Sequence, residues 1–206
     1  MANSPLKTLG KDDLIDIFEL HHMMAITLLK NGPREETFSQ IVEKGMEMTS
    51  SDGATLYLLK NDGALHFETL KNKTFKSDNK SFQPIELSTK SIATDSLNKN
   101  ETILIDDAYL IDREWDVNFN KILDKEKHYR TRSVLAVPLI GSNEEPLGVL
   151  QFINKKNYYE EKWPADPSAV SSMPAFNRVD TYLAQTLGSL LSANLETSLS
   201  KVKNAA

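Results

Sequence analysis

The sequence of 206 residues contains no cysteine. This absence excludes disulfides, cysteine-ligated zinc, iron–sulfur clusters, thiol nucleophiles and thioether-linked chromophores. It also agrees with a reducing compartment. No apolar run approaches the roughly 18 residues that a membrane-spanning helix needs. Residues 1–10 have neither the basic start nor the apolar core of a secretion signal. We therefore expect no membrane insertion and a cytoplasmic location.

Positive charge is not in excess, because 24 Lys and Arg stand against 29 Asp and Glu, giving a formal net charge of −5. Non-specific binding to nucleic acid depends on many phosphate-neutralising Lys and Arg side chains, so no nucleic-acid partner is expected. The sequence has no His or carboxylate cluster with metal-ligand spacing, no glycine-rich phosphate loop and no visible nucleophile–base pair. These absences predict no metal site, no required cofactor and no catalytic residue.

The patterns that are present predict one α+β domain with extensions. Apolar residues recur at helical spacing over 12–30, 34–49, 88–98 and 178–202. Strand patterns cover 54–59, 65–70, 102–105, 133–139 and 146–153, with a short segment at 84–87. Residues 106–131 are expected to form a loop with a helix, and 163–175 a loop. The order of elements predicts a mainly antiparallel sheet of about six strands, with the terminal helices packed on one face.

The last helix has the most regular pattern in the chain. Asn177 is a plausible N-cap, and Asp180 places a carboxylate in the first helical turn. The apolar stripe continues to the chain end, beyond what one sheet face needs. Its distal part, with residues 12–30, suits a helical bundle with a second copy of the chain. We therefore expect a homodimer through the terminal helices.

Four sequence blocks resemble a GAF domain: Glu101-Thr102 to Tyr109, Phe119-Asn120 to Asp124, Tyr129 to Leu139, and Leu147 to Lys155. They are most similar to the GAF domains of cyclic-nucleotide phosphodiesterases, adenylyl cyclases and bacterial HD-type phosphodiesterases. The resemblance covers roughly residues 34–200, which leaves 1–33 as an N-terminal dimerisation or signalling helix and 201–206 as a tail or truncated linker. It implies a GAF-like fold with a helix/loop ligand pocket on the sheet face opposite the terminal helices.

The GAF domains that bind cyclic nucleotides carry an Asn-Lys…Phe-x-x-x-Asp-Glu motif. Asn154, Lys155, Phe176 and Asp180 match it, and Thr181 stands where the family has Glu. In the family the Lys–Asp pair supports the pocket. We expect Lys155 and Asp180 to form an ion pair between the sheet and the last helix, with direct ligand contact as the alternative.

By motif matching, the resemblance also implies a set of ligand-binding positions: Thr55, Leu70, Ile92, Ala93, Asp124, Lys127, Thr131 and Gln151. Leu70, Ile92 and Ala93 would sandwich a purine. Thr131, Lys127 and the backbone amides of 92–93 would serve a cyclic phosphate, aided by the dipole of a helix starting near Ser91. Lys127-His128 and Ser91 depart from the family pattern, which usually has a phosphate-side Thr and a Gly there.

The resemblance implies a non-catalytic regulatory sensor of a bacterial-type signalling protein that binds a small molecule and relays binding through its terminal helices. Cyclic AMP and cyclic GMP are candidate ligands. Without cysteine, the chain is neither a linked-chromophore photoreceptor nor a free methionine-sulfoxide reductase of this fold. The alternative is a ligand-free dimerisation module that regulates an attached cyclase, phosphodiesterase or kinase. Asp107 is expected as a solvated loop acid, and Arg130 and Arg132 as surface charges.

Overall fold

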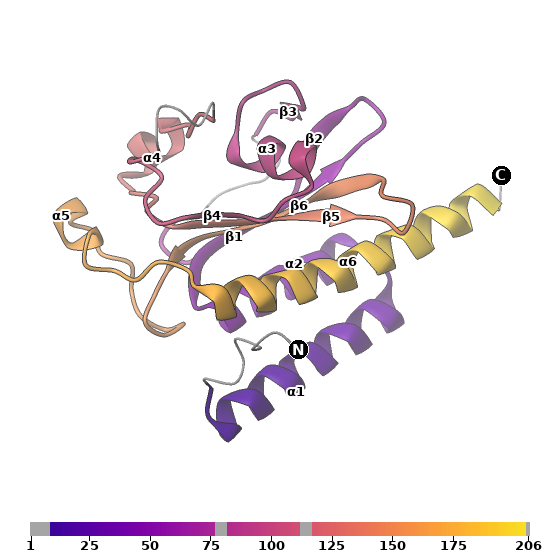
Figure 1. The fold of residues 1–206 in the computed structure, drawn as a ribbon, viewed down its shortest axis with the longest axis horizontal. Helices are drawn as coiled ribbons and strands as arrows, with labels where there is room; N and C mark the ends of the chain where they lie inside the picture. Colours follow the sequence, from indigo (N-terminus) through magenta and orange to yellow (C-terminus); the bar gives the residue numbers. More distant parts are fainter. Residues whose placement is uncertain (1–8, 77–81, 112–116, 205–206) are drawn as a thin grey trace.

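A computed structural model describes residues 9–76, 82–111 and 117–204. Its centre is a six-stranded sheet in the order β3-β2-β1-β6-β5-β4, in which every neighbouring pair is antiparallel. Figure 1 shows the sheet between two groups of helices. The strands are β1 (Ser51–Leu59), β2 (Ala64–Asn72), β3 (Ile85–Glu86), β4 (Ile103–Ile105), β5 (Val134–Ile140) and β6 (Pro146–Lys155).

The helices divide between the two faces of the sheet (Figure 1). Two helices, α2 and α6, lie on one face, and α1 packs outside them against both. Two short helices, α3 and α4, lie on the other face. The helices are α1 (Lys11–Asn31), α2 (Glu35–Thr49), α3 (Ile92–Lys99), α4 (Ile122–Lys127), α5 (Pro167–Val170) and α6 (Arg178–Asn204).

Alternation along the strands builds one apolar core on each face of the sheet. On the α2/α6 face, Leu56 and Phe152 are fully buried against α2 and α6 residues such as Val42 and Leu187. The opposite core is formed by Tyr57, Leu65, Val149 and residues of α3. The predicted fold class is therefore confirmed: a mainly antiparallel sheet has the terminal helices on one face and a helix/loop layer on the other.

Three boundaries differ from the sequence prediction. Strand β1 begins at Ser51, directly after the helix, because Ser50 in a left-handed conformation reverses the chain within one residue. Helix α3 begins at Ile92 and not at Ser88, because Ser91 caps it and accepts a hydrogen bond from the Thr94 amide. The loop predicted at 163–175 contains the one-turn helix α5.

The first turn of α6 has the predicted cap. Asn177 Oδ1 accepts hydrogen bonds from the amides of Val179 and Asp180, and Asp180 Oδ2 accepts one from the Asn177 amide. Among the described residues, none of the helices has the length and apolar character needed to cross a membrane.

Candidate ligand-binding site

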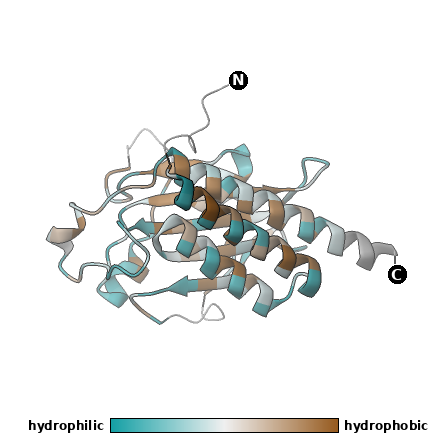
Figure 2. Cartoon of the chain, turned by 90° about the horizontal axis from the view of Figure 1, so that it is seen from below, coloured by the Kyte–Doolittle hydropathy of each residue, from teal (hydrophilic) through white to brown (hydrophobic). Residues whose placement is uncertain are grey.

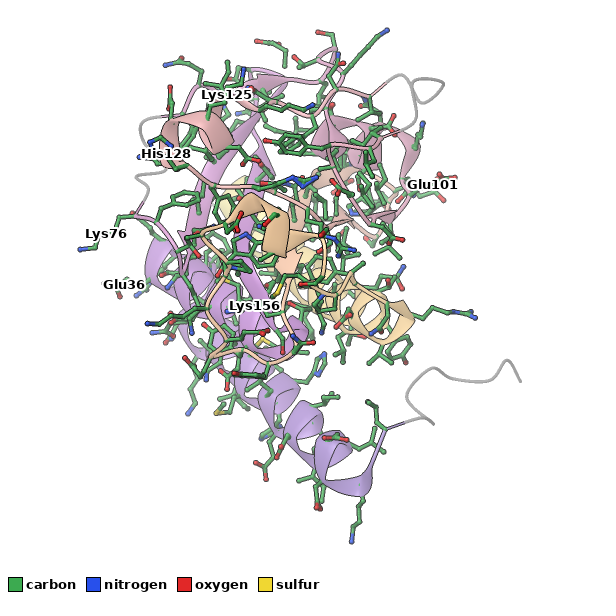
Figure 3. The ribbon with its side chains drawn as sticks, turned by 90° about the vertical axis from the view of Figure 1, so that its left-hand side faces the viewer. Glu36, Lys76, Glu101, Lys125, His128 and Lys156 are labelled. Atoms are coloured by element: carbon green, nitrogen blue, oxygen red, sulfur yellow. The ribbon has the colours of Figure 1, made fainter. Side chains whose placement is uncertain are left out.

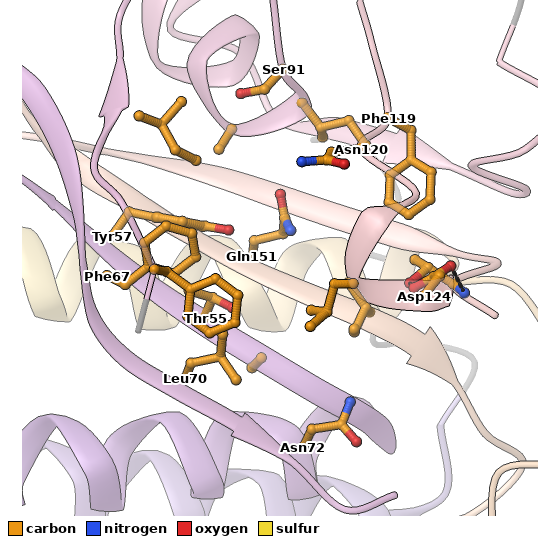
Figure 4. Close-up of a pocket in the computed structure, with 18 of the residues that line it drawn as sticks. Thr55, Tyr57, Phe67, Leu70, Asn72, Ser91, Phe119, Asn120, Asp124 and Gln151 are labelled. Atoms are coloured by element: carbon orange, nitrogen blue, oxygen red, sulfur yellow. Dashed lines mark hydrogen bonds between the residues drawn. The ribbon is translucent and has the colours of Figure 1, made fainter. Parts of the chain in front are cut away.

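A cavity of about 210 Å³ lies between the sheet and the layer that contains α3 and α4 (Figure 4). It is smaller than the ~300–1,000 Å³ typical of drug-sized ligands, so it suits a compact molecule. Residues from β1, β2, β3, β6, α3, α4 and the connections between them line it: Ala54, Thr55, Tyr57, Phe67, Leu70, Lys71, Asn72, Phe75, Phe82, Ile85, Ser91, Ile92, Ala93, Asn118, Phe119, Asn120, Leu123, Asp124, Thr131, Gln151 and Ile153.

One wall of the cavity is aromatic. The Tyr57 and Phe67 rings meet edge to face with centroids 4.8 Å apart, and Phe67 stacks on Phe82 at 4.9 Å. Burial raises the pKa of Tyr57 to about 12, so its hydroxyl stays protonated near neutral pH. Opposite the sheet, α3 contributes the buried side chains of Ile92 and Ala93. The cavity therefore offers apolar and aromatic surface on both sides of a flat ligand.

Asp124 joins α4 to the segment that leads into β5. Its carboxylate accepts hydrogen bonds from the Thr131 amide at 2.7 Å, the Thr131 hydroxyl at 2.9 Å and the Tyr109 hydroxyl at 3.0 Å. Burial raises the pKa of the Asp124 carboxyl, against the lowering effect of these hydrogen bonds. Burial, followed by the Asp124 charge, raises the pKa of Tyr109 to about 12. This cluster holds α4 over the cavity.

A second contact, between Arg130 and Asp107, lies next to Tyr109 and the Asp124 cluster. Arg130 Nη2 donates to both carboxylate oxygens of Asp107, at 2.8 and 3.0 Å, and the guanidinium lies over the Tyr109 ring at 4.5 Å. The prediction that Arg130 is a surface charge and Asp107 a solvated acid is therefore wrong. Their side chains are only 21% and 15% exposed. Because the two residues are 23 positions apart, local alternation did not predict the pairing.

The structure places seven of the eight predicted ligand-binding residues on the cavity lining and leaves out Lys127. Lys127 is exposed at the end of α4 and does not line the cavity. Sequence reasoning missed the aromatic wall and the amides Asn118 and Asn120. Residues 117–120 carry no periodic pattern, so only their proximity to Ser91 in space, through a bridge to Asn118, identifies them.

Beyond Asn72, at one end of the cavity, lies a buried polar network. Asn72 Nδ2 donates to the Tyr129 hydroxyl at 3.2 Å, and this hydroxyl donates to Asp52 Oδ2 at 2.8 Å. Asp52 also accepts from the Thr74 hydroxyl and faces Lys156 Nζ at 3.8 Å. Burial, with the Asp52 charge as the next cause, raises the pKa of Tyr129 well above its ordinary value.

Lys156 is completely buried and donates to the Tyr159 carbonyl at 2.5 Å. Figure 3 shows it near the middle of the view, whereas the labelled Lys76, Lys125 and His128 lie toward the edge. Burial lowers the pKa of Lys156, and the Asp52 charge opposes this shift. The network thus connects the cavity end to residues 156–163, whose Trp163 packs on Tyr129 and donates to the Arg130 carbonyl.

The four motif residues lie outside the cavity lining. Lys155 Nζ donates to Asp180 Oδ1 at 2.7 Å and to the Thr49 carbonyl at 2.9 Å, so the predicted ion pair between sheet and last helix is present. Asn154 takes a left-handed conformation at φ 61°. Its Oδ1 accepts a hydrogen bond from the Arg132 amide, and its Nδ2 donates one to the Arg130 carbonyl. Phe176 is buried in the core on the α2/α6 face. These contacts make the motif a structural support.

The Lys155→Met variant should lose about 2 kcal/mol of unfolding free energy, because Asp180 would keep a buried charge without its cation. The control is Lys44→Met, which removes a pair whose side chains are both 40% exposed and should cost under about 1 kcal/mol. Urea unfolding of both variants measures the difference. Equal losses would show that the Lys155–Asp180 pair contributes no more to the free energy of unfolding than a surface ion pair does.

The architecture matches that of known proteins. The GAF domain from an Acinetobacter phosphoenolpyruvate-protein phosphotransferase aligns at a TM-score of 0.66 and 14% identity, covering 93% of this chain and 97% of that one. The corresponding Coxiella burnetii domain aligns at 0.68 and 14%, covering 92% and 98%. A free methionine-R-sulfoxide reductase from Neisseria meningitidis aligns at 0.65 and 14%, covering 94% and 95%. These identities establish a shared fold alone.

The sequence comparisons give the family. No curated protein sequence matches the chain. The family model described as GAF domain matches residues 33–195, which is most of the chain and includes every strand of the sheet. The chain therefore belongs to the GAF domain family, whose members are generally regulatory sensor modules.

Proposed function

We propose that this GAF domain is a regulatory sensor of a bacterial-type signalling protein, and that it acts by binding a small molecule in the cavity and not by catalysis. The observation that carries the proposal is the cavity itself, which is compact, largely apolar and lined by a few convergent polar groups. A purine fits between the aromatic wall and α3. Cyclic AMP and cyclic GMP are the first candidates, as the resemblance to nucleotide-binding GAF domains implied.

Binding would reach the terminal helices through β6. This strand carries Gln151 on the cavity side and, four residues on, Lys155, which is tied to Asp180 at the start of α6. Further along α6, Asn194 Nδ2 donates to the Leu28 carbonyl of α1 at 3.1 Å. A ligand that favours one position of α4 and β6 shifts the population of α6 and α1 positions with it.

The direct test is to identify any co-purified small molecule by mass spectrometry and to titrate the chain with cyclic AMP and cyclic GMP by calorimetry. Binding heat together with a raised melting temperature supports the proposal, since a ligand that binds only the folded chain stabilises it. The absence of both effects with either nucleotide, and of any co-purified molecule, contradicts it.

A bulky residue in the cavity should abolish binding. Leu70 lines the cavity and is half-buried on β2, so Leu70→Trp should fill the space at little cost in stability and weaken binding more than about tenfold. Leu104→Trp is the matched control, because Leu104 is 42% exposed on the opposite edge strand β4. If Leu70→Trp binds as wild type does, the ligand lies elsewhere.

One observation favours a second function, dimerisation through the terminal helices. Of the described residues of α1, only Met24 and Leu28 are buried, and Phe18 and Leu29 are 72% and 79% exposed. Figure 2 looks onto this helical layer and shows apolar segments along α1. Light scattering tests the proposal: a dimer that Phe18→Glu converts to monomer supports it, and a monomer at all concentrations contradicts it.

A further inference from the structure

The charged groups on the cavity lining are already engaged. Among the described lining residues, only Lys71 and Asp124 carry charge. Lys71 Nζ pairs with Glu43 at 2.7 Å, and the Asp124 carboxylate accepts three hydrogen bonds from protein groups. An anionic ligand would therefore find no free cation among these residues and would lie near a carboxylate.

The hydroxyl groups expected to bind a phosphate are engaged as well. The Thr131 hydroxyl and amide both donate to Asp124, and the Ser91 hydroxyl exchanges hydrogen bonds with Thr94. The backbone amides at the start of α3 remain as donors to a phosphate, since the first amides of a helix have no intrahelical acceptor. A helix terminus alone improves anion binding by only about two- to five-fold.

The amide side chains, in contrast, are available. Gln151 makes no side-chain hydrogen bond within the described part of the chain, and neither does Asn118, while Asn120 uses only its Oδ1, which accepts from the Ile122 amide. Gln151 lies in the middle of the sheet, opposite Thr55 of β1 and Ala136 of β5. Figure 4 shows its amide standing off the sheet into the cavity, on the side where Asn120 lies.

A side-chain amide presents a donor and an acceptor side by side. The edge of a purine or a related heterocycle presents the complementary pair, and such a ring has flat faces that suit the wall of Tyr57, Phe67 and Phe82. The small cavity volume, about 210 Å³, also favours a ring over a larger charged ligand. The shape, polarity and charge of the lining therefore all favour an uncharged planar ring.

We infer that the ligand of this cavity is recognised through an uncharged planar heterocycle of the nucleobase or nucleoside class. Gln151 forms hydrogen bonds with the edge of this ring, and a phosphate on the ligand adds little affinity. This inference rests on the proposed sensor function and narrows its ligand class. It also gives Gln151 the specificity-determining role, with the amides of Asn118 and Asn120 on the same cavity lining.

The test compares adenosine and guanosine with cyclic AMP and cyclic GMP by calorimetry on the complete chain, at low and high salt. We expect the preferred nucleoside to bind within about three-fold of its cyclic monophosphate, with an affinity that salt does not weaken. If the cyclic nucleotides bind more than about tenfold tighter and lose this advantage at high salt, the inference is wrong while the sensor function stands. If none of the four binds, the purine ligand itself is wrong.

Two variants test the role of Gln151. Gln151→Leu keeps much of the packing volume and should weaken nucleoside binding by about tenfold, because the ring edge loses its hydrogen-bonding partner. Gln185→Leu is the control: Gln185 is exposed on α6, where it donates to the Thr102 hydroxyl, and its loss should leave affinity unchanged. Thermal unfolding shows that both variants are folded. Wild-type affinity in folded Gln151→Leu overturns the assignment.

Discussion

Gly148→Ala should make this protein unfold at denaturant concentrations at which the wild type remains folded. Gly148 lies in the central strand β6, paired with Leu58 of β1 on one side and Leu139 of β5 on the other. A Cβ atom there would sit 2.1 Å from the Tyr57 carbonyl oxygen and 3.2 Å from the Leu58 Cα. Both atoms belong to the backbone, so relief requires the two strands to separate.

We expect the loss to reach about 3 kcal/mol or more, a large part of the 5–15 kcal/mol that stabilises a typical domain. Chemical denaturation followed by circular dichroism measures it. The control is Gly141→Ala in the same hairpin, where the nearest atoms are those of the exposed Glu145 side chain. A Gly148→Ala protein within about 1 kcal/mol of wild type would contradict the close approach of β1 and β6 at this point.

The parts of the fold that local sequence determines were predicted from the sequence. The sequence Asn61-Asp62-Gly63 is typical of a hairpin turn and lies between the two predicted strands that form β1 and β2. Apolar spacing predicted α1, α2 and α6. The start of β1 at Ser51 was missed because it depends on pairing with Lys155, more than a hundred positions away. In the same way, α3 begins where Ser91 forms a capping box with Thr94, and three earlier residues with ordinary helix propensity do not join it.

The candidate site shows the same division. The motif blocks led to seven residues of the cavity lining, because six of those positions lie on regular strands and helices and Thr131 lies in the connection between α4 and β5. They did not reveal that Thr131 is bound to Asp124 and that Arg130 is bound to Asp107. Both contacts form within the irregular segment 106–131, where no period relates sequence to spatial position. The structure therefore changes the expected chemistry: groups assigned to a phosphate hold the cavity wall together.

Asp52→Ala should cost about 3–5 kcal/mol of unfolding free energy, the usual result of breaking a buried ion pair from one side. Asp52 is 1% exposed and accepts hydrogen bonds from the hydroxyls of Tyr129 and Thr74, both at 2.8 Å. It is also the carboxylate that faces the buried Lys156 ammonium at 3.8 Å. The variant leaves the buried Tyr129 hydroxyl and the buried Lys156 ammonium without their acceptor in a place that water does not reach, whereas the exposed Thr74 hydroxyl can bind water instead.

The double variant Asp52→Ala/Lys156→Met separates the ionic part of this loss. Met replaces the buried lysine with an apolar side chain of similar length, so the double variant should recover part of the stability that Asp52→Ala loses. The remaining deficit measures mainly the unpaired hydroxyl of the buried Tyr129. If the double variant is less stable than Asp52→Ala, Lys156 does not act there as an uncompensated cation.

The pH dependence of Asp52→Ala gives an independent check on Lys156. Burial already lowers the pKa of Lys156, and Asp52 opposes that shift, so the variant should lower this pKa further. The unfolded chain, with a lysine pKa of about 10.4, then binds more protons than the folded chain at alkaline pH. Stability of the variant relative to wild type should therefore rise as pH increases toward that value. A deficit that is constant with pH would mean that Lys156 is already neutral in the folded protein or that it reaches water once Asp52 is gone.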